Sequence, residues 1–129
     1  MTLPRILIVD DEPEILRLLA RRLTRRGYQV SQASGSQEAL ARLQEAIFDL
    51  AILDYMMPDT NGLELARRCR TRQPTLQVLI LTGSPVTSEI ERAGYPYLRK
   101  PLENLDHLDE AIEGLVAIAQ RERAAERDS

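Results

Sequence analysis

Carboxylate, hydroxyl and ammonium side chains follow the short apolar runs of this chain. Asp10 and Asp11 come after ILIV, Asp54 after LAIL, Thr82 after VLIL, and Lys100 after a more polar run. Carboxylates crowded together raise one another's pKa unless a cation joins them, and a set of oxygen ligands favours Mg²⁺. We therefore expect a Mg²⁺ site in which Asp54 is a nucleophile able to carry a phosphoryl group.

Lys100 is the one lysine among 17 basic residues, and the rest are arginines. A compact ammonium suits contact with a small anion such as a phosphoryl oxygen, and the Thr82 hydroxyl would add a second contact. Each residue also has a plainer interpretation. Lys100 could be a lysine by chance. Asp10 or Asp11 could merely cap the first helix, and Asp54 could belong to a turn before Pro58.

The apolar runs alternate with helical patterns, which predicts an α/β fold. Continuously apolar runs are typical of strands covered on both faces, and Pro96 suits an edge strand. The expected architecture is a doubly wound, five-stranded parallel sheet of order 2-1-3-4-5, with its ligand site between the first and third strands. Few residues separate Gly83 from Gly94, so the fourth helix must be short. The five expected strands are 6–9, 28–33, 50–53, 78–81 and 95–98.

Composition narrows the classes of protein to consider. A chain of 129 residues suits one domain, and a net charge of -3 argues against direct nucleic-acid binding. No apolar run approaches membrane-spanning length, and the lone Cys69 fits a reducing cytoplasm. We expect the domain to occupy residues 1–119, followed by a polar helix extension or linker over residues 120–129.

Four motifs resemble the receiver domains of two-component response regulators. They are ILIVDDEPE, LAILDYMMPDTNGLEL around Asp54, LILTG, and YLRKP. The resemblance covers about residues 4–119. It implies a flavodoxin-like or CheY-like three-layer sandwich that acts as a signalling switch in phosphorelay signal transduction, not as an enzyme with a separate substrate.

The resemblance also assigns roles at the site. Asp54 would accept a phosphoryl group from a phosphohistidine on a sensor histidine kinase or a histidine phosphotransfer protein. Mg²⁺ would be bound by Asp11, Asp54 and the backbone carbonyl of Met56, with Asp10 acting through water. The resemblance further implies an output partner or a fused output domain.

Further residues are assigned by the same resemblance. Thr82 and Tyr97 match the switch pair, and the Lys100–Pro101 peptide is expected to be cis. We expect Leu16 to lie off the core stripe of the first helix, exposed for docking of the phosphodonor protein. Pro101 is a second candidate docking residue.

The interval between Thr82 and Lys100 is a few residues shorter than is usual in this family. The fourth helix, fifth strand and fifth helix form the family's usual output and dimer surface. We therefore expect that phosphorylation is kept but that the standard dimer through residues 86–97 is absent.

Three other functions can be compared with the sequence of the site. A haloacid dehalogenase-type phosphatase requires an Asp-x-Asp loop, whereas this chain has Asp10, Asp11 and Glu12. A flavodoxin-like FMN carrier requires a phosphate loop, and the acidic DDEPE segment would repel phosphate. A pseudo-receiver that binds a partner without phosphorylation is the remaining alternative.

Overall fold

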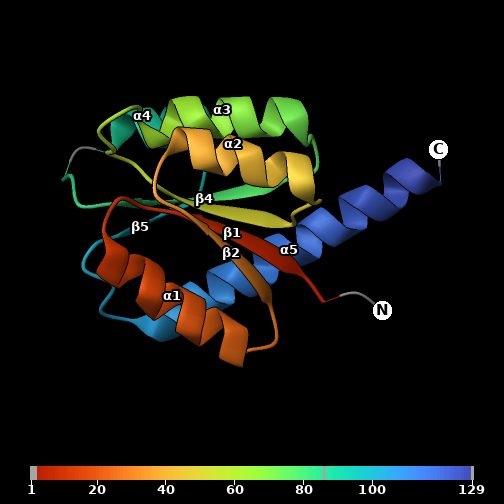
Figure 1. The fold of residues 1–129 in the computed structure, drawn as a ribbon, viewed down its shortest axis with the longest axis horizontal. Coiled ribbons are helices and arrows are strands. Elements are labelled where there is room, and N and C mark those ends of the chain that lie inside the picture. The colour runs from red at the N-terminus through yellow and green to blue at the C-terminus, as the bar shows by residue number, and fades with distance from the viewer. Residues whose placement is uncertain (1–2, 86, 129) are drawn as a thin grey trace.

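The computed structural model describes residues 3–85 and 87–128, which form strands and helices in strict alternation (Figure 1). The strands are β1 (Arg5–Val9), β2 (Gln29–Ala33), β3 (Leu50–Asp54), β4 (Gln77–Thr82) and β5 (Tyr97–Arg99). The helices are α1 (Pro13–Arg25), α2 (Ser36–Glu45), α3 (Gly62–Arg72), α4 (Ser88–Ala93) and α5 (Leu105–Arg127).

The strands form one parallel sheet in the order β2-β1-β3-β4-β5, which confirms the predicted topology. Val9 pairs with Leu53 in the ladder between β1 and β3. Asp10 and Asp54 are the next residues along these two strands, so they leave the ladder at the same level. The register alone therefore brings two of the predicted site residues together.

Two hydrophobic cores cover the two faces of the sheet, because successive residues of a strand point to opposite sides. In β3, Ala51 and Leu53 belong to the core between the sheet and helices α2, α3 and α4. Leu50 and Ile52 belong to the core between the sheet and helices α1 and α5. Figure 1 shows α2, α3 and α4 on one side of the sheet and α1 and α5 on the other. This arrangement is the expected three-layer sandwich.

The buried face of α1 differs from the predicted one. Leu16 is 9% exposed and packs in the core with Leu19 and Leu23, whereas Leu18 is 45% exposed. The expectation that Leu16 is exposed was wrong. Leu16, Leu19 and Leu23 are spaced as one helical stripe, and the sheet selects that stripe over the neighbouring one through Leu18.

The two last helices differ greatly in length. α4 has 6 residues, as the short interval predicted, and Ile90 is its buried side chain. α5 has 23 residues and continues without a break past residue 119, well beyond the sheet (Figure 1). Arg123, on this extension, donates a hydrogen bond of 2.6 Å to the Asp49 carboxylate, so the first part of the extension is packed on the domain.

Candidate functional site

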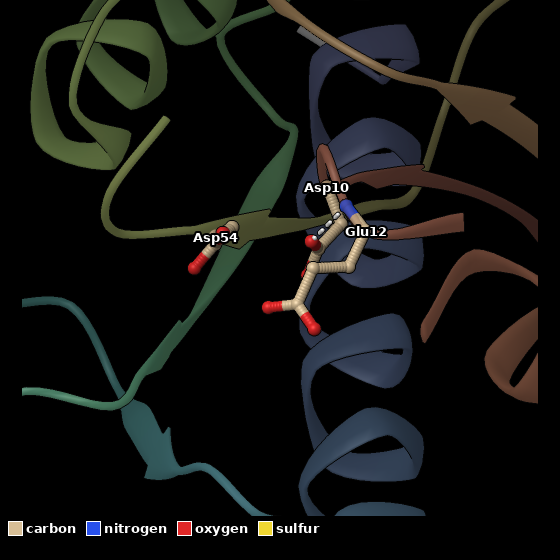
Figure 2. A group of neighbouring side chains, drawn as sticks. All are labelled: Asp10, Glu12 and Asp54. Atoms are coloured by element: carbon tan, nitrogen blue, oxygen red, sulfur yellow. Dashed lines mark hydrogen bonds between the residues drawn. The ribbon is translucent and has the colours of Figure 1, made fainter. Parts of the chain in front are cut away.

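The predicted site residues converge at the carboxyl end of the sheet. Asp10 follows β1, Asp54 and Thr82 are the last residues of β3 and β4, and Lys100 follows β5. Figure 2 shows the side chains of Asp10, Glu12 and Asp54 gathered beside these strand ends. The Lys100–Pro101 peptide is cis, as the resemblance implied.

The Lys100 ammonium lies among three carboxylates. Its Nζ is 2.7 Å from Asp10 Oδ2, 3.4 Å from Glu12 Oε1 and 3.4 Å from Asp54 Oδ1. Burial by itself would lower the pKa of Lys100, but the hydrogen bond to Asp10 and the charges of Asp54 and Glu12 raise it overall. The ammonium is therefore firmly protonated and partly neutralises the acidic cluster.

Asp54 is the most strongly perturbed carboxyl group of this cluster. Burial, and secondly the negative charge of Asp10, raise its pKa from 3.8 to about 6, although Lys100 partly opposes the shift. Its side chain is 8% exposed. The group is thus ionised at neutral pH but is destabilised in that form, which makes it a good partner for a cation or an electrophile.

One group of carboxylates could hold a metal ion. Oxygen atoms of Asp10, Glu12 and Asp54 all lie within 4.8 Å of one another among the residues that the structure describes. Oxygen-only donors of this kind suit Mg²⁺. Asp11 is exposed and lies outside this group, while Glu12, which the sequence analysis did not select, lies inside it. The position of Glu12 directly after Asp10 and Asp11 was the sequence feature that could have identified it as a member of this group.

The loop after Asp54 turns back closely on its own strand. The Gly62 amide donates a hydrogen bond of 2.7 Å to the Tyr55 carbonyl. A Cβ atom at Gly62 would lie 2.7 Å from the backbone oxygen of Asp54, so a side chain here would collide with the site. Met56, whose carbonyl is a predicted metal ligand, has an exposed side chain (66%) and bridges to Asn61 across this loop.

Side chains tie the same loop to two neighbouring helices. The Ser36 amide at the start of α2 donates a hydrogen bond of 3.1 Å to the Asp59 carboxylate. The Tyr55 hydroxyl, adjacent to Asp54 in sequence, donates a hydrogen bond of 2.9 Å to Glu89 in α4. The loop is therefore tied to both α2 and α4, and the sequence had given no sign of either contact.

The two predicted switch residues lie at different levels of the sheet. Thr82 is fully buried, and its Oγ1 accepts a hydrogen bond of 3.1 Å from the Ser84 amide. Tyr97 is half-buried and packs against the core under α4. Its hydroxyl donates a hydrogen bond of 2.8 Å to Glu91. In this conformation Tyr97 links β5 to α4.

Comparison with known proteins agrees with this geometry. Residues 6–113 match the family model described as "Response regulator receiver domain". The chain belongs to this family. The receiver domain is 44% identical over 79 residues to the transcriptional regulatory protein ResD of Bacillus subtilis, covering 61% of this chain and 32% of ResD.

Two further relatives match over more of their length. The receiver domain is 32% identical to the response regulator receiver protein CpdR of Brucella abortus over 108 residues, which are 84% of this chain and 90% of CpdR. Its structure resembles the response regulator TrrA of Thermotoga maritima, solved in complex with Mg²⁺ and BeF, with a TM-score of 0.78 and 35% identity. That match covers 88% of this chain and 99% of that chain.

The chain thus spans about a third of ResD but most of CpdR. Within the residues that the structure describes, no helix is both long enough and apolar enough to cross a membrane.

Proposed function

We propose that this receiver domain accepts a phosphoryl group on Asp54 and thereby switches an output surface. The observation that supports this most directly is the position of Lys100, whose ammonium lies 2.7 Å from Asp10 and 3.4 Å from Asp54 at the strand ends. An ammonium beside an ionised, destabilised carboxylate suits the transfer of an anionic group, because it balances charge on both reactants.

In the proposed transfer, an Asp54 oxygen attacks the phosphorus of a phosphohistidine on a sensor histidine kinase or histidine phosphotransfer protein. The new P–O bond forms as the P–N bond breaks, and the electron pair remains on the imidazole nitrogen. Asp54 must be ionised to attack, and its pKa of about 6 leaves most molecules ionised at neutral pH. Lys100 and the Thr82 hydroxyl are the proposed contacts to the phosphoryl oxygens.

Mg²⁺ is the proposed cofactor because the donors at the site are oxygen atoms. Bound Mg²⁺ would supply positive charge that offsets the carboxylates and the phosphoryl oxygens. Asp11, Asp54 and the Met56 carbonyl would hold it, with Asp10 acting through water. The neighbouring carboxylate oxygens of Asp10, Glu12 and Asp54 provide the negative charge and the oxygen donors that such a site needs, which supports this proposal.

The proposed readout runs through Thr82 and Tyr97. Thr82 would turn toward the phosphoryl group, and Tyr97 would exchange its contact with Glu91 for a more buried position. Because Tyr97 holds α4, this exchange would alter the surface that α4 presents. Residues 1–119 are the proposed receiver domain, and residues 120–129 a helix extension or linker to an output partner.

The experiment is intact-mass measurement after incubation with Mg²⁺ and a small acyl-phosphate donor, with and without a chelator. We expect one added phosphoryl group that needs Mg²⁺, is lost in Asp54→Asn, and is kept in the exposed control Asp106→Asn. Uptake by Asp54→Asn at the wild-type rate would identify a different acceptor. No adduct under any condition would favour a domain that works without phosphorylation.

The Lys100→Arg variant tests the role of the ammonium separately. It keeps the charge but replaces a compact ammonium by a larger planar group, which does not fit the same space between Asp10 and Asp54. We expect slower uptake of the phosphoryl group in the same mass assay. An unchanged rate would show that the site needs positive charge without a defined geometry.

A further inference from the structure

Glu12 stands at the N-cap position of α1, yet its side chain makes no capping hydrogen bond. Instead its carboxylate points toward the acidic cluster (Figure 2). Its Oε1 lies 3.4 Å from Lys100 Nζ. Its own backbone amide donates a hydrogen bond of 2.9 Å to Asp10 Oδ1, which fixes its position relative to the site. The side chain is therefore directed at the cluster, not used to cap the helix.

The three carboxylates around Lys100 differ in exposure. The side chains of Asp10 and Asp54 are 1% and 8% exposed, while that of Glu12 is 62% exposed. Glu12 thus lies at the mouth of the cluster, where an ionised carboxylate costs little to keep. It can change its contacts without leaving a buried charge unpaired.

A divalent cation held by Asp11 and Asp54, with Asp10 acting through water, would compete with Lys100 for the negative charge of Asp54 and Asp10. The cation and the ammonium also repel each other, because both are positive. Of the three carboxylates that contact Lys100, Glu12 is the one outside the proposed metal-binding set. Without it, Lys100 would gain by moving out toward solvent, away from the acceptor.

We propose that Glu12 is a positioning residue for Lys100: it keeps the ammonium beside Asp54 when a divalent cation occupies the proposed metal site. This inference rests on the proposed function, since it concerns the metal-bound state of that site. The proposal also accounts for the absence of a capping hydrogen bond from the Glu12 side chain at the N-cap position of α1.

The first test is a double-mutant cycle on Mn²⁺ affinity, measured by electron paramagnetic resonance without any phosphoryl donor. The variants are Glu12→Gln, Lys100→Met and the double variant, with Glu14→Gln as a control that removes one exposed charge from the first turn of α1. We expect Glu12→Gln to weaken Mn²⁺ binding roughly threefold to tenfold, and Glu14→Gln by much less.

The cycle distinguishes the positioning of Lys100 by Glu12 from a simple effect of the Glu12 charge on the metal ion. If Glu12 acts through Lys100, its loss weakens Mn²⁺ binding at least about twofold more when Lys100 is present than in the Lys100→Met background. An equal loss in both backgrounds would overturn the proposal, because Glu12 would then be a direct ligand or a bulk charge. No loss in either background would overturn it as well.

The second readout is the rate of phosphoryl uptake at saturating Mg²⁺. We expect Glu12→Gln to lower this rate while Glu14→Gln matches the wild type, and urea unfolding to show both variants folded. An unchanged saturating rate would contradict a positioning role. Uptake by the wild type tests the proposed function, whereas the Mn²⁺ cycle needs no phosphoryl group, so the two can fail independently.

Discussion

We expect replacement of Asp54 by asparagine to stabilise the metal-free domain at neutral pH, although it removes the proposed acceptor. Burial and the nearby charge of Asp10 raise the pKa of Asp54 from 3.8 to about 6. The folded state therefore binds this proton more tightly than the unfolded state does. Above pH 6 the ionised carboxylate opposes folding, and asparagine removes that charge.

The magnitude follows from the size of the shift. A difference of about two pKa units corresponds to about 3 kcal/mol of stability, at 1.36 kcal/mol per unit. The mouth of the site is open to water, so we discount this to about 1–2 kcal/mol for screening. The advantage of Asp54→Asn is full above pH 6, shrinks as the pH falls toward 3.8, and vanishes below that value.

The assay is urea unfolding of the wild type and Asp54→Asn between pH 3.5 and 8, with Asp106→Asn as the exposed control. Saturating Mg²⁺ is expected to narrow the gap, because the cation stabilises the ionised wild-type site. A variant less stable than the wild type at pH 7.5, or a difference that does not change with pH, would refute the reasoning.

Two further substitutions test contacts that support the site and the long helix. Gly62→Ala places a Cβ atom 2.7 Å from the backbone oxygen of Asp54. We expect a loss of about 2 kcal/mol in urea unfolding and slower phosphoryl uptake, and an unchanged midpoint would contradict this. Arg123→Ala leaves the Asp49 carboxylate, whose side chain is 3% exposed, without its ionic partner. We expect a loss of about 2 kcal/mol, whereas the exposed control Arg121→Ala is neutral; equal effects of the two would contradict the prediction.

Periodicity and position along the strands were enough to predict that most of the candidate residues converge at one edge of the sheet. Continuously apolar runs such as LAIL require cover on both faces, and the carboxyl ends of parallel strands meet at one edge. Asp10, Asp54, Thr82 and Lys100 could therefore be assigned to one site before any distance was known. Their convergence depends on topology and on hydrophobic pattern, both of which can be read locally.

The rotation of α1 could not be predicted in the same way. Leu16 and Leu18 are both leucines, and each can form an apolar stripe with Leu19. Packing on the sheet buries Leu16 and exposes Leu18. The choice depends on the angle at which the whole helix docks, and helical periodicity does not determine that angle.

What the sequence determined by itself was the order of strands, the short fourth helix and the identity of the residues at the strand ends. The tertiary structure alone decided that Glu12, not Asp11, joins the acidic group and that Arg123 reaches Asp49. Apolar periodicity is a local property that covers many residues and is enforced by burial. A single side-chain contact depends instead on rotamers and on the approach of elements far apart in the chain, such as Glu12 and Lys100.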